Sequence, residues 1–179
     1  MERETSNVSW LVLKTKPRTE KKIYQQLTTA GISAFLPSYC VMRQWSDRKK
    51  KVEVPLIPGV VFVQNILTDT YSLYDFPHVT GILKEFGKPA LVTQQEVENL
   101  QILVKELNGE MIEAHETCNF RHGDPVEVIR GNFTGVVGNL LSINGKHRLV
   151  VQLKSLNVEF TVNIPKSHVR RVESLEIRT

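Results

Sequence analysis

The side chains that most often carry catalysis or bind metal ions are few in this sequence, and their spacing suits neither task. Cys40 and Cys118 lie far apart and lack the Cys-x-x-Cys spacing of a zinc or redox site, and Cys40 is expected to be buried. No glycine-rich phosphate loop occurs. The histidines also lack metal-ligand spacing, and they are His78, His115, His122, His147 and His168. The sequence therefore predicts no enzyme, no metal site and no cofactor.

The distribution of charge indicates binding instead of catalysis. The chain of 179 residues has a net charge of +4, but residues 1–51 carry 11 Lys and Arg against 4 Asp and Glu. The remaining residues carry 12 Lys and Arg against 15 Asp and Glu. A basic amino-terminal part on a mildly acidic body favours a surface for a polyanion, although a cationic surface can also be merely solvated.

Two further features of the sequence bear on where the protein works. No apolar run approaches the roughly 20 residues that a membrane span requires. Residues 1–7 lack the apolar core of a signal peptide. Both features predict a cytoplasmic protein without a membrane partner.

The basic residues must be positioned by the elements of the first hundred residues, which have the pattern of an α+β domain. A buried strand is predicted over residues 10–15, followed by a helix from Pro17 to about Ala30 that ends at Gly31. Thr93 and Glu96 form a capping box that begins a second long helix, which stops at Gly109. Between the helices we expect strands at 32–37, 39–45, 52–56, 59–65 and 79–86, a hairpin with a basic tip at 46–51, and a short helix at 70–76.

The apolar corner and strand over residues 54–63 are the most informative stretch. Pro55 and Pro58 fix φ and remove two backbone donors, while Gly59 permits a left-handed turn. The strand that follows is too apolar to have a solvated face, so it belongs at the centre of a sheet. We expect the corner to hold Ile57 outward at its rim, where a partner must cover it.

The last sixty residues have a different pattern. Residues 107–119 are acidic and without periodicity, as a linker is. Short alternating strands are predicted at 126–129, 133–141, 148–153 and 158–164, and Asn144-Gly145 is a strong type I′ hairpin signal. Phe133 is assigned to the core of this unit. Short strands with tight turns predict a small β-barrel.

Two sets of motifs stand in order along the chain. The first set is Trp10, Lys16-Pro17-Arg18, Pro58-Gly59, Phe62-Val63 and Gly87-Lys88-Pro89. The second set is Gly123-Asp124-Pro125-Val126-Glu127-Val128, Gly131, Phe133 and Gly135. Together they resemble the NusG family of transcription factors from residue 8 to about residue 174, and the second set resembles a KOW domain. Val60 stands where family members often carry an aromatic residue, which favours a specialised paralogue of the RfaH-like or capsule-locus type.

The resemblance implies an α+β protein. Its first part would be an α/β sandwich with an antiparallel sheet, and its second part a small SH3-like β-barrel. The implied divisions are a flexible start at 1–7, a polymerase-binding domain at 8–106, a linker at 107–119, a KOW domain at 120–174 and a tail at 175–179.

The resemblance also implies an elongation and antitermination factor that binds RNA polymerase and bridges its clamp, which suppresses pausing and termination. The apolar pocket that receives the clamp helices maps to Trp10, Ile57, Val60 and Phe62. For Trp10 and Phe62, plain core packing is at least as good an interpretation. For Val60 the two interpretations are evenly balanced, whereas Ile57 is expected to contact the clamp.

Two more contacts follow from RfaH-type relatives. The contact with the polymerase β subunit maps to Asp69, Thr70, Tyr71 and Ser72, although Asp69 and Thr70 could simply cap a helix. Contact with exposed non-template DNA maps to Lys16, Lys22 and Gln26, with Arg18, Lys21 and the basic tip from Arg48 to Lys51 nearby. Lysines attract phosphates without reading bases, whereas Gln26 could pair with a base edge. A solvated helix face is the alternative for each residue, and the candidate stacking aromatics are Tyr24 and Trp45.

In the second unit, Leu156 falls where NusG carries an exposed loop aromatic that holds ribosomal protein S10 or Rho. A side chain that caps the barrel is the alternative interpretation. KOW barrels also occur in ribosome-associated RNA-binding proteins, which is the second candidate function. The barrel is the less basic part of this chain, and this weighs against that candidate.

Overall fold

The computed structural model describes residues 9–45, 48–64, 72–106, 113–116, 123–143, 146–153 and 156–172. The predicted α+β class is confirmed, because two α-helices accompany several antiparallel sheets. The chain divides into two compact units, Met1–Val97 and Glu98–Thr179. The division falls within helix α2 (Gln94–Glu106).

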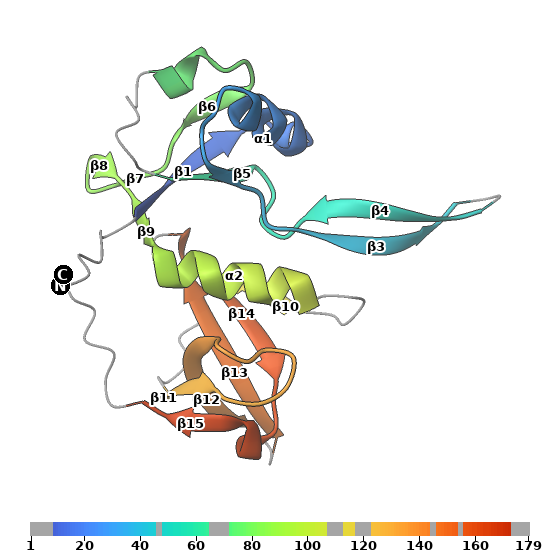
Figure 1. Cartoon of the computed structure of the whole chain (residues 1–179), viewed down its shortest axis with the longest axis vertical. Coiled ribbons are helices and arrows are strands. Elements are labelled where there is room, and N and C mark those ends of the chain that lie inside the picture. The colour runs from blue at the N-terminus through green and yellow to red at the C-terminus, as the bar shows by residue number, and fades with distance from the viewer. Residues whose placement is uncertain are drawn as a thin grey trace. The chain divides into compact units, whose positions relative to one another are not determined.

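In its described residues, the first unit contains helix α1, the start of α2, a turn of 3-10 helix and nine strands. Figure 1 shows their arrangement. Strand β1 is the centre of its main sheet. It pairs with β5 along one edge and with β6 and β9 along the other, and β2 extends the sheet beyond β5. The elements are β1 (Ser9–Thr15), α1 (Glu20–Thr29), β2 (Ala34–Phe35), β3 (Ser38–Gln44), β4 (Lys49–Pro55), β5 (Val60–Gln64), η1 (Ser72–Asp75), β6 (Val79–Ile82), β7 (Lys84–Glu85), β8 (Lys88–Pro89) and β9 (Leu91–Thr93).

Helix α1 covers one face of this sheet. Alternation along β1 places Leu11 and Leu13 on that face, where they join Ile23 and Leu27 of α1 in one buried cluster. Burying one such side chain contributes about 2 kcal/mol, so this cluster fixes the helix against the sheet. The cationic side chains of α1 are thereby left to its outer surface.

Strands β3 and β4 form a separate two-stranded ribbon, which Figure 1 shows extending away from the main sheet. Their pairing runs from Ser38 opposite Pro55 to Gln44 opposite Lys49. Beyond the last pair, the backbone N–H of Trp45 donates to the carbonyl of Arg48 at 2.8 Å. The predicted hairpin is confirmed, but its predicted tip at 46–51 is too long, because residues 49–51 are already paired in β4. Residues 46–47 lie outside the described residues.

Local sequence signals decide several element ends in the first unit. The capping box is confirmed, because the Thr93 N–H donates to the Glu96 carboxylate at 2.9 Å and the Glu96 N–H donates to the Thr93 hydroxyl at 3.3 Å. Gly31, with φ of +77°, follows the end of α1 as expected. The predicted helix at 70–76 is only the one-turn η1, and the predicted strand at 79–86 is broken into β6 and β7.

The second unit is a six-stranded antiparallel sheet with the order β10-β14-β13-β12-β11-β15. The sequence predicts a linker at 107–119, and within that range the structure has β10, which pairs with β14. The division into domains at the predicted residues stays a prediction. The strands are β10 (Glu113–Glu116), β11 (Asp124–Val128), β12 (Val137–Ile143), β13 (Lys146–Leu153), β14 (Val158–Asn163) and β15 (Val169–Arg171), and η3 (Lys166–His168) is a 3-10 turn.

Phe160, rather than Phe133, is the large aromatic residue in the core of this unit. Phe160 is fully buried in β14, whereas Phe133 is half-buried. Phe133 lies in a turn before β12, where its carbonyl accepts a hydrogen bond from the N–H of Val136 at 3.0 Å. The assignment of Phe133 to the core is therefore wrong, because the turn takes it out of the alternating strand pattern.

Helix α2 contributes a polar contact to the second unit. The side chain of Asn99 is buried, and its amide group donates to the carbonyl of Val137 at 2.9 Å. The N–H of Val137 donates to the Asn99 side-chain oxygen at 3.2 Å. One side chain thus satisfies both backbone groups of a strand residue.

Candidate functional site

The sheet face opposite α1 carries three of the four residues assigned to the clamp pocket. In the β1–β5 pairing, Phe62 lies opposite Val12, and Trp10 and Val60 lie two residues along their own strands on the same face. Phe35 of β2 joins this face, with its ring centroid 6.1 Å from that of Phe62. The indole N–H of Trp10 donates to the side-chain oxygen of Gln94 at 2.7 Å. The same pairing places Gln64 opposite Trp10 and Lys14 opposite Val60, so this second face has an apolar centre with a polar residue at each end.

The side chain of Ile57 is not exposed at the corner. Its side chain is only 8% exposed, and those of Trp10, Val60 and Phe62 are equally or more deeply buried. The corner is instead turned inward by contacts of Gly59, whose φ is +73°. The Gly59 N–H donates to the Glu20 carboxylate at 2.8 Å, and its carbonyl accepts from the Thr15 N–H at 2.9 Å. The expectation of an exposed Ile57 is therefore wrong, because two contacts distant in sequence determine the course of the corner.

Glu20 is a functional candidate that the sequence pattern did not identify. It is the first residue of α1 and is 4% exposed, which is unusual for a carboxylate that has no cationic partner among the residues described. A backbone N–H satisfies one of its oxygens. A glutamate at the start of a helix has a general explanation in the helix dipole, so nothing in the sequence distinguished this one.

Of the four residues predicted to contact the β subunit, the structure describes only Ser72. Asp69, Thr70 and Tyr71 lie outside the described residues. Ser72 begins η1 and is exposed, which leaves its side chain accessible to a partner.

The cations assigned to DNA binding lie at the start of α1 and on the preceding loop. Lys16, Arg18, Lys21 and Lys22 are all exposed. Arg18 has φ of +66°, a left-handed conformation that turns the chain between Pro17 and the helix. The four positive charges therefore occupy one accessible segment of the first unit.

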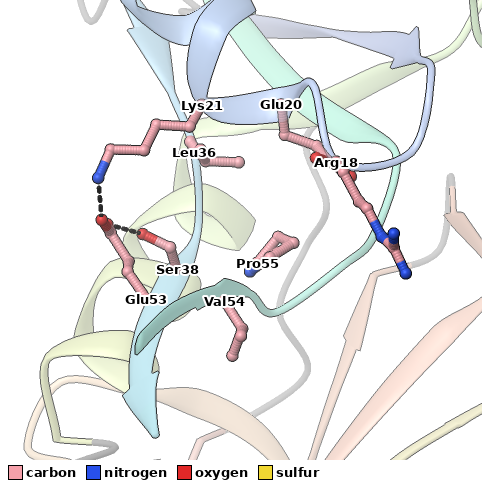
Figure 2. A pocket seen from close by; sticks show the side chains of 8 residues that line it. All are labelled: Arg18, Glu20, Lys21, Leu36, Ser38, Glu53, Val54 and Pro55. Atoms are coloured by element: carbon pink, nitrogen blue, oxygen red, sulfur yellow. Dashed lines mark hydrogen bonds and ion pairs between the residues drawn. The ribbon is translucent and has the colours of Figure 1, made fainter. Parts of the chain in front are cut away.

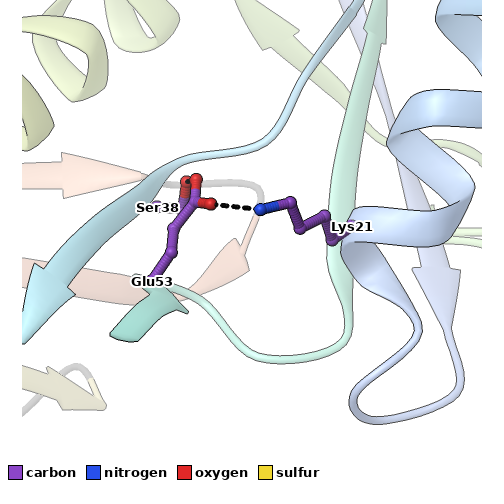
Figure 3. Close-up of polar contacts among 3 residues, drawn as sticks. All are labelled: Lys21, Ser38 and Glu53. Carbon is purple, nitrogen blue, oxygen red and sulfur yellow. Dashed lines mark hydrogen bonds and ion pairs between the residues drawn. The ribbon is translucent and has the colours of Figure 1, made fainter. Parts of the chain in front are cut away.

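One of these cations is already paired. The Lys21 ammonium group donates to the Glu53 carboxylate at 2.6 Å (Figure 3). The Ser38 hydroxyl donates to the other oxygen of Glu53 at 2.6 Å. The bond to Glu53 raises the pKa of Lys21, and the bonds from Lys21 and Ser38 lower the pKa of Glu53. Lys21 is therefore less available to a phosphate than Lys16, Arg18 and Lys22, for which no carboxylate partner is found in the described part of the chain.

The side chain of Gln26 is partly enclosed by the protein and is not exposed for contact with DNA. It is half-buried, and its side-chain oxygen is shielded from solvent without a hydrogen-bond partner among the described residues. A base edge can reach this oxygen only if the side chain rotates. The predicted base contact is untested and stays a prediction.

A pocket of about 250 Å³ opens between the start of α1 and the base of the ribbon (Figure 2). Its lining mixes charges of both signs with an apolar part. Figure 2 shows the Arg18 side chain pointing away from the Lys21–Glu53 pair, so the two cations do not converge. The lining residues are Arg18, Glu20, Lys21, Leu36, Ser38, Glu53, Val54 and Pro55.

The exposure of three further side chains bears on the candidate sites. Leu156 in the second unit is half-buried and precedes Asn157, whose φ is +53°. Phe86 is 99% exposed at the turn between β7 and β8, where its φ of +49° is uncommon for a bulky residue. Cys40 in β3 is exposed, contrary to the expectation that it is buried.

The described residues contain neither a metal-binding cluster nor a membrane-spanning helix. Within these residues, no group of three or more His, Cys, Asp or Glu side chains is arranged to hold a metal ion. Among the helices described, none is long and apolar enough to cross a membrane.

Comparison with known proteins gives consistent matches. The family model described as "Transcription termination factor nusG" matches residues 8–101. The transcription termination/antitermination protein NusG of Streptococcus pyogenes serotype M1 is 26% identical over 159 residues, which are 80% of this chain and 86% of that protein. The protein of the same name from Rickettsia felis is 26% identical over 178 residues, which are 89% of this chain and 90% of that one. The solved structure "Domain interaction in Thermotoga maritima NusG" has 23% identity and a TM-score of 0.47, and the match covers 93% of this chain and 98% of that one.

Proposed function

This chain belongs to the NusG family, and from that premise we propose that it is a transcription elongation and antitermination factor that binds RNA polymerase. It bridges the polymerase clamp and thereby suppresses pausing and termination. A ligand that prefers the closed clamp depopulates the open, paused form by population shift, and no chemical step is needed. This activity implies that the protein works in the cytoplasm, at the nucleoid.

The apolar face around Trp10, Val60 and Phe62 is the observation that carries the clamp contact. These side chains gather on the sheet face opposite α1, and Ile57 stands at the corner that leads into β5. A few central apolar anchors dominate the affinity of such interfaces once water is excluded. Because all four side chains are buried, the clamp helices must displace whatever covers them.

Three weaker contacts complete the proposal. Ser72, with Asp69, Thr70 and Tyr71 before it, contacts the β subunit. Lys16, Arg18 and Lys22 attract the phosphates of exposed non-template DNA, which fits their exposure. Leu156 in the KOW domain recruits ribosomal protein S10 or Rho.

Single-round transcription on a paused template tests the proposal. The dwell time of bacterial RNA polymerase is measured without protein, with the full chain, and with Ile57→Ala. The control is Ile82→Ala, because Ile82 is 7% exposed, has the same side chain and lies in the α1-side cluster. Both truncations cost about 2–5 kcal/mol of stability, so thermal melts verify that both variants are folded at the assay temperature.

The expected result is a shorter dwell time with the full chain and with Ile82→Ala, and an unshortened dwell time with Ile57→Ala. Equal activity of the two variants shows that Ile57 is not part of the clamp pocket. If the full chain shortens no pause, either on a general template or on its own gene's leader sequence, the proposal of a polymerase clamp is wrong.

The alternative of a ribosome-associated RNA-binding protein gains no specific support. Residues 98–179 carry ten Lys and Arg against ten Asp and Glu, so the second unit has no excess of positive charge. Two of its arginines, Arg170 and Arg171, are paired with Glu127 and Asp124.

A further inference from the structure

The pocket between the start of α1 and the base of the β3–β4 ribbon has a buried carboxylate in its wall. Glu20 lines this pocket of about 250 Å³ and is 4% exposed. A carboxylate is rarely buried to this extent, because the loss of hydration is unfavourable unless hydrogen bonds or a cation compensate for it. The partners of the two Glu20 oxygens therefore show which compensation the protein provides and which it leaves to a ligand.

Only one of the two Glu20 oxygens has a partner in the part of the chain that the structure describes. Oε1 accepts the hydrogen bond from the Gly59 N–H at 2.8 Å, whereas no hydrogen bond or ion pair joins Oε2 to another described residue. Among the described residues, the fully enclosed side-chain atoms without a partner are Gln26 Oε1 and His147 Nδ1, and Glu20 Oε2 is not one of them. Oε2 is therefore accessible from the pocket.

The charges around the pocket leave the negative charge of Glu20 without a counterion. Glu53, the other carboxylate of the lining, is neutralised by Lys21 at 2.6 Å and also accepts the hydroxyl group of Ser38. Arg18 is the second cation of the lining, but it is exposed and makes no ion pair with another described residue. Figure 2 shows its side chain directed away from the ion pair. The pocket therefore suits a cation and not an anion.

The remaining lining of the pocket is apolar. It consists of Leu36, Val54 and Pro55, which are half-buried. Figure 2 shows Leu36 and Pro55 between Glu20 and the ion pair. A hydrated inorganic cation gains nothing from such a surface, whereas an aliphatic chain gains from every methylene that it buries there. Pockets for drug-sized ligands measure about 300–1,000 Å³, so this smaller pocket suits a short chain.

We propose that this pocket binds a primary ammonium group carried on a short aliphatic chain. The ammonium group donates a hydrogen bond to Glu20 Oε2 and supplies the missing positive charge, while its chain lies against the apolar lining. A hydrogen bond between two charged groups is about twice as strong as one between neutral groups. The site does not depend on binding to polymerase or to DNA.

The single accessible oxygen favours an ammonium group over a guanidinium group. A guanidinium group binds a carboxylate best through two parallel N–H donors, one to each oxygen. The Gly59 N–H already occupies Oε1 of Glu20, so this arrangement is blocked. An ammonium group is a compact charge that needs one oxygen only, and its other donors remain hydrated at the open side of the pocket.

The test adds n-butylammonium chloride to the full chain and follows the Gly59 amide in proton–nitrogen correlation NMR spectra. The Gly59 N–H donates to the same carboxylate, so its resonance is expected to shift when a cation binds Oε2. The amide of Gly81 in β6 is the internal control, because β6 lies on the other side of β1 from β5. The salt concentration is about 0.15 M, at which exposed charges more than about 8 Å apart are largely screened. n-Butanol has the same chain without the charge and is expected to shift neither amide.

Glu20→Gln removes the charge and keeps an acceptor oxygen for Gly59. We expect this variant to bind n-butylammonium more weakly by on the order of 10-fold, because a hydrogen bond to a charged group is stronger than one to a neutral group. The matched control is Glu85→Gln, which removes an exposed carboxylate from β7 and is expected to bind like the wild type. Thermal melts verify that both variants are folded. Equal affinities of Glu20→Gln and the wild type overturn the proposal.

The length of the aliphatic chain tests the apolar part of the pocket. In the series from methylammonium to n-butylammonium, each methylene that becomes buried is expected to tighten binding about four-fold. The same affinity across the series means that the amine forms an exposed ion pair outside the pocket, which overturns the proposal. A Gly59 shift no larger than that of Gly81 overturns it as well.

Two sources carry this chemistry, a free aliphatic amine and a lysine side chain of a partner protein. Nα-acetyl-lysine methylamide has the same butylammonium chain on a peptide backbone and is added in a separate titration. Tighter binding of this probe than of n-butylammonium identifies the lysine side chain as the ligand. Equal or weaker binding identifies the free amine. Either result supports the ammonium site, provided that Glu20→Gln weakens binding.

Discussion

The carboxylate of Glu20 accepts a hydrogen bond from the backbone N–H of Gly59 at 2.8 Å, across 39 residues of sequence. This contact joins the first residue of α1 to the corner that leads into β5. A hydrogen bond to a charged acceptor is stronger than a neutral one, and this acceptor is buried. The two segments that carry the candidate clamp and DNA residues are thereby held together.

Removal of this acceptor is expected to loosen the corner. Glu20→Ala leaves the Gly59 N–H unpaired, which costs about 1–3 kcal/mol in a urea unfolding experiment. Glu20→Gln keeps an acceptor oxygen and is expected to retain most of the stability. The control is Glu85→Ala, because Glu85 is exposed in β7. Equal losses for Glu20→Ala and Glu85→Ala show that the contact does not stabilise the fold.

The Lys21–Glu53 pair makes the free energy of unfolding depend on pH, and the two pKa shifts determine the direction of this dependence. The hydrogen bonds from Lys21 and Ser38 lower the pKa of Glu53 below the usual 4.5. The stability that the Glu53 carboxylate contributes is therefore fully present above pH 4.5 and is lost as pH falls through the lowered pKa. The bond to Glu53 raises the pKa of Lys21 above 10.5, so that contribution is full below 10.5 and is lost as pH rises through the raised pKa.

An NMR titration of the Glu53 carboxyl group checks this assignment. The pKa is expected below 4.5 in the wild type and higher in Lys21→Met, since the hydrogen bond from Lys21 is the largest cause of the shift. Ser38→Ala should raise the pKa by less. An identical Glu53 pKa in the wild type and in Lys21→Met means that the two side chains are not paired in solution.

Gly123 is expected to tolerate no side chain. An added Cβ would lie 1.9 Å from the carbonyl oxygen of Leu140, which is backbone and has no room to move. Gly123→Ala must therefore shift β11 or β12, at a cost of about 1–3 kcal/mol or more. Gly81→Ala is the control, because its Cβ meets nothing within 4 Å. Thermal melts of both variants measure the difference, and equal melting temperatures contradict the steric argument.

The capping box makes a local prediction for α2. Thr93→Ala removes the hydroxyl that accepts from the Glu96 N–H, and such a loss costs about 0.5–2 kcal/mol. Thr93→Ser keeps the hydroxyl and should be close to wild type. Urea unfolding of the three proteins is the measurement, and a Ser variant as unstable as the Ala variant shows that the threonine methyl group matters instead.

The sequence predicted those features that short segments decide. Thr93 with Glu96, Gly31 after α1, and the alternation of Phe160 and Val162 in β14 depend on neighbours a few residues away. The exposure of Ile57 and Cys40 could not be predicted in this way. Burial of Ile57 depends on contacts of Gly59 with Glu20 and Thr15, and exposure of Cys40 depends on a ribbon that leaves the sheet.

The same distinction applies to the candidate site. Alternation along β1 and β5 brings Trp10, Val60 and Phe62 to one face, and the family resemblance had grouped them. The sequence could not tell which lysines have a carboxylate partner, because such partners are distant in the chain. The structure pairs Lys21 with Glu53, 32 residues away, and gives Lys50 no partner among the described residues.

The contact of Asn99 with Val137 has a consequence for self-association. Strand β13 pairs with β12 only from Asn139 onward, so the outward peptide groups of Val137 would otherwise form an open strand end. The amide of Asn99 presents a donor and an acceptor there, as a neighbouring peptide group would. Open strand ends are templates for pairing with a second chain. Helix α2 therefore occupies the two backbone groups that Val137 would otherwise offer to a second chain, although the helix contributes no strand to the sheet.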